Sequence, residues 1–171
     1  LLRPLTTGNF DVTSFYGIDE KTGKFYFQAA TPTPMDRQVW EGDLKGGAPR
    51  LLTPKTGTST ADFCPTFEYY ALTWSDANTP TVATLCDRTG NTLKTFTDNP
   101  RVRRTCGEYG WVNKEFFQIP TPDGTVLNAW KLTPTKLDSA RHYPVLFDIY
   151  GGPGAQTVLN EFDGYKGAWH Q

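Results

Sequence analysis

The chain has 171 residues and a formal net charge of −1, with 17 Lys and Arg residues against 18 Asp and Glu residues. Its basic residues form no dense block, which argues against nucleic-acid binding because phosphate contacts need a concentrated basic surface. Aromatic residues make up 14% of the chain, beside 16 Gly and 13 Pro residues. This composition predicts a turn-rich β protein with many short strands, and no apolar run reaches the length of about 18 residues that a membrane span needs.

The first residue is Leu1, and the sequence shows neither a starting Met nor a signal-peptide pattern. We therefore expect a segment of a longer protein. The sequence by itself leaves the cellular compartment open.

Residues 8–97 predict two copies of one unit, each made of four short strands. The expected strands are 9–15, 24–30, 37–44 and 49–53 in the first copy, and 60–67, 69–75, 80–86 and 92–97 in the second. Gly-containing turns recur in register between the copies, and a period of about 45 residues with four antiparallel strands is typical of β-propeller blades. The alternative is a plain antiparallel β domain in which the similarity of the two halves is accidental.

The three cysteines are Cys64, Cys86 and Cys106. Their odd number and wide spacing indicate neither a disulfide framework nor a zinc site. Buried free thiols are favoured over a Cys64–Cys86 bridge between neighbouring strands, which requires a Cα separation that the sequence does not reveal.

Residues 98–110 are polar and contain Asp98-Asn99-Pro100, Gly107 and Gly110, which predicts a solvated linker. The segment also carries Arg101, Arg103 and Arg104. Ion pairs between these arginines and carboxylates across a domain interface are an alternative, although exposed pairs contribute little stability.

A β-hairpin is predicted next, with strands at 112–119 and 125–132 around the turn 120–124, Pro-Thr-Pro-Asp-Gly. A polar connection over residues 133–143 follows. The candidate core contacts of the hairpin are Phe116, Ile119, Val126 and Trp130.

Residues 145–150 form a short apolar run that predicts a strand buried on both faces, as in a parallel sheet. Strand alternation places Tyr150, Asp148 and Leu146 on one face. Asp148 would then be a buried carboxylate that needs a partner, and a structural role is favoured over a catalytic one. The glycine-rich stretch 151–154 ends the strand, and open α/β sheets bind ligands at such strand ends. Residues 155–167 show no firm period, and residues 167–171 could begin a helix.

The stretch 143–156, Tyr-Pro-Val-Leu-Phe-Asp-Ile-Tyr-Gly-Gly-Pro-Gly-Ala-Gln, follows a hairpin with Pro-Asp-Gly at its tip. Together they resemble the start of the α/β-hydrolase domain of the prolyl oligopeptidase family of serine peptidases, and residues 148–156 resemble its dipeptidyl peptidase IV branch. Residues 8–12, 44–46 and 50–53 are similar to the last propeller blades of that branch.

The fold that the resemblance implies is mostly β. All-β propeller blades with a linker would occupy residues 1–108. The start of an α/β-hydrolase domain, truncated before the nucleophile, would occupy residues 109–171.

The resemblance implies that the hydroxyl of Tyr150 donates a hydrogen bond to the oxyanion formed during acyl transfer, where a placed donor stabilises developing charge. The alternative for Tyr150 is a strand-end ring that only packs. The residues expected to shape this loop are Gly151, Gly152, Pro153 and Gln156.

The sequence contains no Gly-x-Ser-x-Gly nucleophile elbow. The family places Ser, Asp and His in that order after the tyrosine loop, so His142 and His170 are not triad candidates. We expect both to be surface or helix-start residues. Nothing matches the paired glutamates with which the branch holds a substrate's amino terminus.

The resemblance implies that the chain is part of a serine exopeptidase that releases X-Pro or X-Ala dipeptides through an acyl-enzyme, with no cofactor and no metal. The piece alone should be inactive. The implied partners are peptides with penultimate Pro or Ala, the family allows a homodimer of the intact enzyme, and the implied location is secreted, periplasmic or membrane-anchored outside the cytoplasm. The alternatives are a non-catalytic propeller module or pseudo-peptidase, and a relative of prolyl endopeptidases or acylaminoacyl peptidases.

A further expectation concerns the strand 145–150. If its flanking parallel strands are missing from the 171 residues, a neighbouring chain should cover it or its apolar side chains should be conspicuously exposed, because soluble domains avoid bare strand edges.

Overall fold

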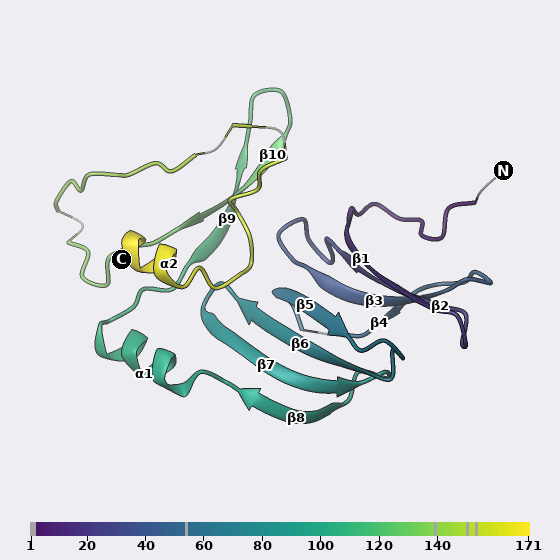
Figure 1. Ribbon diagram of the computed structural model, residues 1–171. Helices are drawn as coiled ribbons and strands as arrows, with labels where there is room; N and C mark the ends of the chain where they lie inside the picture. The colour runs from purple at the N-terminus through teal and green to yellow at the C-terminus, as the bar shows by residue number, and fades with distance from the viewer. Residues whose placement is uncertain (1–2, 54, 139, 150, 153) are drawn as a thin grey trace.

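The computed structural model describes residues 3–53, 55–138, 140–149, 151–152 and 154–171. Two four-stranded antiparallel sheets lie side by side and a two-stranded hairpin projects from one end of them (Figure 1). The first sheet consists of β1 (Val12–Asp19), β2 (Lys24–Ala29), β3 (Gln38–Asp43) and β4 (Arg50–Leu51), and the second of β5 (Thr58–Phe63), β6 (Tyr69–Asp76), β7 (Thr79–Asp87) and β8 (Thr92–Thr97).

Each sheet is a meander in which consecutive strands pair, in the orders β1-β2-β3-β4 and β5-β6-β7-β8. All eight strands predicted from the repeat are therefore confirmed, as is the interpretation of the two units as propeller blades. The ends differ by a few residues: β1 begins at Val12, three residues late, and β4 shortens to Arg50–Leu51.

The main core lies between the two sheets, which pack face to face as propeller blades do. Its buried members are Tyr26, Val39, Leu52, Ala61, Tyr70 and Cys86. Phe63 and Phe67 of the second unit pack their rings on Tyr26 of the first, with centroids 4.6 and 5.1 Å away. The other face of β2 buries Phe25 and Phe27 in a smaller cluster, so β2 is covered on both sides.

The two sheets also exchange backbone hydrogen bonds at one end. Arg37 forms an isolated parallel bridge with Thr58. The Arg37 N–H donates to the Gly57 carbonyl at 2.9 Å, and the Ser59 N–H donates to the Arg37 carbonyl at 2.8 Å. This bridge fixes the residues just before β3 against the start of β5.

The predicted linker at 98–110 is wrong in one respect, because it contains the helix α1 (Pro100–Glu108). Pro100 occupies the first helical turn, where its missing N–H has no intrahelical partner to lose. No residue of α1 is buried. The alternative of ion pairs across a domain interface does not hold for two of the arginines, because Arg103 and Arg104 lie near Asp98 and Glu108 of their own segment, at 3.5 and 3.7 Å.

The predicted hairpin forms from β9 (Glu115–Pro120) and β10 (Val126–Lys131), with Phe116 opposite Trp130. Phe116 and Trp130 are half-buried. The expected core contacts of Ile119 and Val126 are wrong, because both side chains are exposed. They lie near the tip of a hairpin that extends away from the sheets (Figure 1).

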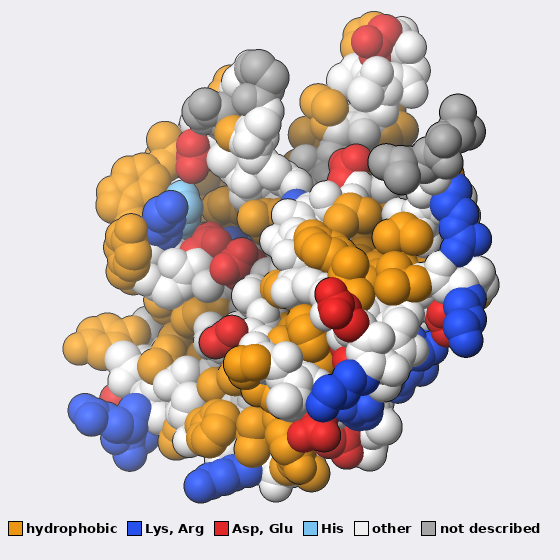
Figure 2. Space-filling view, turned by 45° about the vertical axis from the view of Figure 1, so that its right-hand side comes forward, with side chains coloured by type: hydrophobic (Ala, Val, Ile, Leu, Met, Phe, Trp, Pro, Cys, Tyr) orange, Lys and Arg blue, Asp and Glu red, His pale blue; other side chains and the backbone are white. Residues whose placement is uncertain are grey.

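Residues 142–149 run as an extended connection without a strand, so the predicted buried strand is wrong for the part that the structure describes. Phe147 is 81% exposed and Ile149 87% exposed. Among the described residues no strand pairs with this stretch, so no neighbouring strand covers these side chains. The exposure of Phe147 and Ile149 matches the expectation of exposed apolar side chains. Figure 2 shows the apolar side chains that one face of the molecule presents.

The chain then returns to the sheets and ends in α2 (Tyr165–His170), two residues earlier than the helix start predicted at 167. No helix in the described ranges is long and apolar enough to cross a membrane. The cysteines are free thiols, so the Cys64–Cys86 bridge is wrong. Cys86 is buried as expected, whereas Cys64 and Cys106 are half-buried.

The turn between β7 and β8 gives a pH-dependent prediction. The hydroxyl of Thr89, helped by the backbone N–H and side-chain amide of Asn91, holds the pKa of Asp87 at about 2. Because an unfolded aspartate has a pKa of about 3.9, this interaction contributes stability above that pH and loses it as the pH falls towards 2. We expect Asp87→Asn to flatten the fall in urea midpoint over this window. The same change at exposed Asp62 should leave the fall as it is in the wild type.

Candidate functional site

The glycine loop after residue 149 carries the residues predicted to form the site. Tyr150 and Pro153 lie outside the described residues. Gly151 and Gly154 are exposed and Gly152 is half-buried. Gly154 has φ +81°, in the left-handed region that other residues adopt at a cost. The described part of the loop therefore includes a backbone conformation that favours glycine.

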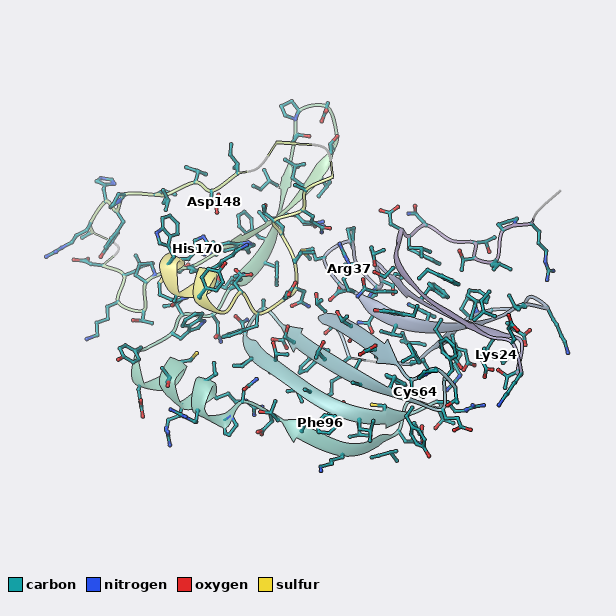
Figure 3. All side chains as sticks on the ribbon, in the orientation of Figure 1. Lys24, Arg37, Cys64, Phe96, Asp148 and His170 are labelled. Carbon is teal, nitrogen blue, oxygen red and sulfur yellow. The ribbon has the colours of Figure 1, made fainter. Side chains whose placement is uncertain are left out.

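Gln156 ends the loop with hydrogen bonds to the connection between β2 and β3. Its Oε1 accepts from Nη2 of Arg37 at 2.6 Å, and its Nε2 donates to the carbonyls of Pro34 at 2.8 Å and Val158 at 3.1 Å. Arg37 lies at the end of the first sheet that faces this part of the chain (Figure 3). The loop is thus tied to a blade at its last residue.

Asn160 uses every polar group it has to bind both sheets. Its N–H donates to the Met35 carbonyl at 2.9 Å, and its Nδ2 donates to Oδ1 of Asp36 at 2.9 Å. Its Oδ1 accepts from the N–H of Ala77 at 3.0 Å, and its carbonyl accepts from the hydroxyl of Thr58 at 3.2 Å. We call residues 156–163 the crossing segment, because they run across the ends of both sheets (Figure 1).

Asp36 is the partner of Asn160 and is only 3% exposed. Its Oδ1 also accepts from the N–H of Gly57 at 2.8 Å, and its Oδ2 accepts from the hydroxyl of Thr33. A buried carboxylate is tolerated when donors surround it in this way. Gly57 is required here: its φ is +111°, and an added Cβ would lie 2.3 Å from the Ser75 carbonyl oxygen.

The far end of the crossing segment is fixed as well. The N–H of Phe162 donates to Oγ of Ser75 at 3.3 Å, and Asp163 forms an ion pair with Lys114. The Lys114 side chain is nearly buried, and its ammonium lies 4.6 Å from the centre of the Trp130 ring. These contacts connect the segment to the hairpin and to the second sheet.

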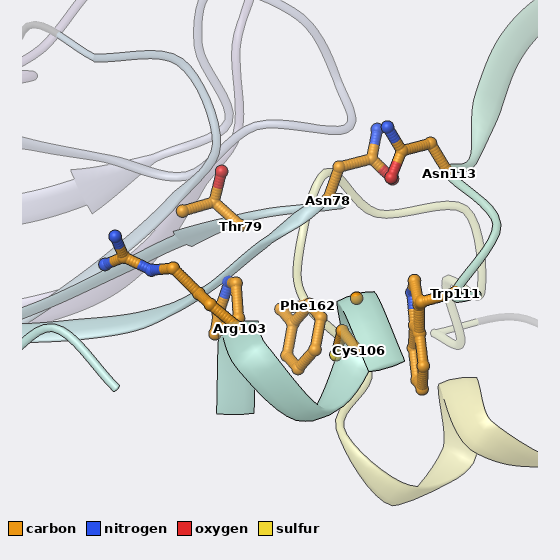
Figure 4. A pocket seen from close by; sticks show the side chains of 9 residues that line it. Asn78, Thr79, Arg103, Cys106, Trp111, Asn113 and Phe162 are labelled. Atoms are coloured by element: carbon orange, nitrogen blue, oxygen red, sulfur yellow. The ribbon is translucent and has the colours of Figure 1, made fainter. Parts of the chain in front are cut away.

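A hollow of about 390 Å³ lies beside the crossing segment, between α1 and the β6–β7 turn (Figure 4). The labelled side chains around it are Asn78, Thr79, Arg103, Cys106, Trp111, Asn113 and Phe162. A larger hollow of about 860 Å³ separates α1 from α2 and shares Cys106, Trp111 and Phe162 with the first. The side chains around the two hollows include the Cys106 thiol and threonine hydroxyls, but the residues that line them include no His, Asp or Glu that could act as the base for a nucleophile.

Asp148 and His170 meet, which the sequence did not indicate. Oδ2 of Asp148 lies 3.5 Å from Nε2 of His170, too far for a strong hydrogen bond (Figure 3). The side chain of Asp148 is 60% exposed, so its predicted burial is wrong. His170 is also not a helix-start residue: it lies in the last turn of α2, half-buried, with its ring against Trp130 and Trp169. His142 is exposed, as expected.

Across the ranges that the structure describes, no group of three or more His, Cys, Asp or Glu side chains is arranged to hold a metal ion. The contacts of the crossing segment hold one part of the chain in place. They fix the crossing segment, which follows the glycine loop, against the two sheets.

Sequence reasoning missed Asp36, Arg37 and Asn160. Asn160 falls in a stretch without periodicity, and Asp36 and Arg37 sit in a connection between strands. The only available signal was the Thr-Pro-Met-Asp turn at 33–36, which is typical of a polar loop.

Comparison with known proteins gives the family context. Residues 1–81 match the sequence model described as the dipeptidyl peptidase IV (DPP IV) N-terminal region. A probable dipeptidyl peptidase 4 of Aspergillus flavus is 31% identical over 161 residues, which cover 93% of this chain and 21% of that protein. One of Arthroderma benhamiae is 32% identical over 157 residues, 90% of this chain and 20% of that protein.

The crystal structure of Porphyromonas gingivalis dipeptidyl peptidase 4 has the same fold over 95% of this chain and 23% of that one. The TM-score is 0.88 and the sequence identity 38%. The chain therefore spans about a fifth of the length of the curated relatives that it matches. The predicted resemblance to the dipeptidyl peptidase IV branch is confirmed.

We expect Asp36→Ala to lower the free energy of unfolding by about 2–4 kcal/mol, because it removes the acceptor of the buried N–H of Gly57 and of the half-buried amide of Asn160. Urea denaturation measures the change. Asp62→Ala, which removes an exposed carboxylate in β5, should shift the midpoint very little. Equal midpoints for the two variants would contradict the account of Asp36.

Proposed function

Because the chain is a relative of the dipeptidyl peptidase IV proteins, we propose that it is part of a serine exopeptidase that releases X-Pro or X-Ala dipeptides from the amino terminus of peptides. The supporting observation is the likeness to a solved dipeptidyl peptidase 4 over 95% of this chain. In this proposal residues 1–108 are propeller blades with their linker. Residues 109–171 begin the α/β-hydrolase domain.

The chemistry proposed for this chain is the stabilisation of negative charge. When a serine attacks the scissile carbonyl, charge develops on the carbonyl oxygen, and a donor already in place lowers the barrier. We assign that donor to the hydroxyl of Tyr150. Gly151, Gly152, Pro153 and Gln156 shape the loop that carries it.

The serine, its base and the groups that hold the substrate's amino terminus come from other parts of the full-length protein in this proposal, since the sequence has no Gly-x-Ser-x-Gly elbow. His142 and His170 take no part in the triad. In this proposal the partners are peptides with penultimate Pro or Ala, the intact enzyme is a homodimer, and it is secreted, periplasmic or membrane-anchored outside the cytoplasm. The support for all three is the family resemblance.

The two blades also fit a second candidate, a propeller-containing binding protein of the same family without a nucleophile. The residue at the elbow of the full-length chain separates the two. A serine there fits the peptidase, and a replaced serine fits the binding protein.

The 171-residue chain alone should not hydrolyse a Gly-Pro chromogenic substrate, because it lacks a nucleophile elbow. Purified chain is assayed beside a mock purification from the same host. Turnover that scales with the amount of chain and exceeds the mock would refute the assignment of the nucleophile to another part of the protein.

In the full-length protein, Tyr150→Phe should lower kcat by about 100- to 1000-fold, because it removes one donor to the oxyanion and leaves the ring in place. Steady-state kinetics on Gly-Pro substrates measure the effect, with circular dichroism as the check on folding. Tyr69→Phe, at a half-exposed position of β6, is the matched control and should keep the wild-type rate. An unchanged kcat for Tyr150→Phe would remove Tyr150 from the oxyanion hole.

A further inference from the structure

The described glycines of the loop add little to its geometry. Gly151, Gly152 and Gly154 restrict the backbone less than other residues do, and added Cβ atoms at Gly151 and Gly154 would meet nothing within 4 Å. A catalytic donor on such a loop gains its effect only if something else keeps it in place, since a misplacement of about 1 Å can cost about 100-fold in rate.

The crossing segment supplies an anchor at short range. Gln156 is six residues beyond position 150, so the fixed end of the loop restricts that position to within about 20 Å even for fully extended backbone. Gln156 is bound to Arg37 and Pro34, and Asn160 is bound to both sheets. The anchor is therefore rigid on the blade side.

The contacts with Asn160 are specific in direction. Nδ2 of Asn160 faces a carboxylate oxygen of Asp36 and its Oδ1 faces the N–H of Ala77, so only an amide satisfies both partners. Arg37 likewise presents one N–H group to Gln156 while its other nitrogen bonds the carbonyls of Pro34 and Asp36. Isosteric substitutions can therefore break the anchor without removing volume.

Resting on the proposed function, we propose that Asn160 and Gln156 are positioning residues of the peptidase. Through Asp36 and Arg37 they fasten the glycine loop to the two blades, so that the Tyr150 hydroxyl is presented to the oxyanion. Turnover then depends on residues of the propeller that never contact the substrate. A purely structural junction would instead affect stability and leave the rate of folded enzyme unchanged.

The test uses the full-length enzyme with Asn160→Asp, which keeps the shape of the side chain, removes its donor and places a second carboxylate against Asp36. We expect kcat to fall by roughly 10- to 100-fold with KM little changed. The control is the same change at exposed Asn9, which should retain wild-type kinetics. Gln156→Ala, at an exposed position, is the second variant and should lower kcat in the same way if Asn160→Asp does not fold.

The deciding measurement repeats each variant in the Tyr150→Phe background. If the anchor acts through Tyr150, the loss caused by Asn160→Asp or Gln156→Ala should nearly vanish there, because there is no hydroxyl left to position. An equal loss in both backgrounds would overturn the positioning role while the proposed function stands. Wild-type kcat for folded Asn160→Asp and Gln156→Ala would overturn it too. If Tyr150→Phe itself has no effect, the proposed function fails and this inference fails with it.

Discussion

The buried carboxylate of Asp36 is the constraint on which the junction depends. A charge at 3% exposure needs donors around it, and these come from Thr33, Gly57 and Asn160. Each donor belongs to a different part of the chain: the turn before β3, the approach to β5, and the crossing segment. Satisfying one side chain thus aligns the two sheets and brings back residues far along the sequence.

This arrangement combines two packed sheets with a glycine-rich loop. The two sheets share a well-packed aromatic core and a backbone bridge between Arg37 and Thr58, which fixes the surface that the crossing segment meets. The described residues of the glycine loop are mostly glycines, which restrict the backbone less than other residues do. In the proposed peptidase the blades therefore support the loop that carries Tyr150.

Local patterns were enough to predict the two blades, because alternating side chains and Gly-containing turns are properties of neighbouring residues. Local patterns failed where the structure of a segment depends on residues far away in the sequence. The run around Phe147 has the composition of a buried strand, yet it pairs only if other strands lie beside it. The hydrogen bond between Asp36 and Asn160 joins residues 124 positions apart, and nothing periodic marks either residue. α1 was missed for a local reason: the polar composition around Pro100 hid a helix start.

The most direct test of this account is residue-resolved hydrogen exchange in the full-length protein. The N–H groups of Asn160, Gly57 and Ala77 should be protected like those of the central strand β6, and Asp36→Asn should release all three while the amides of β8 stay as they were. An Asn160 amide that exchanges at the rate of an unstructured peptide in the wild type would contradict the account. So would an Asp36→Asn variant that releases Gly57 alone.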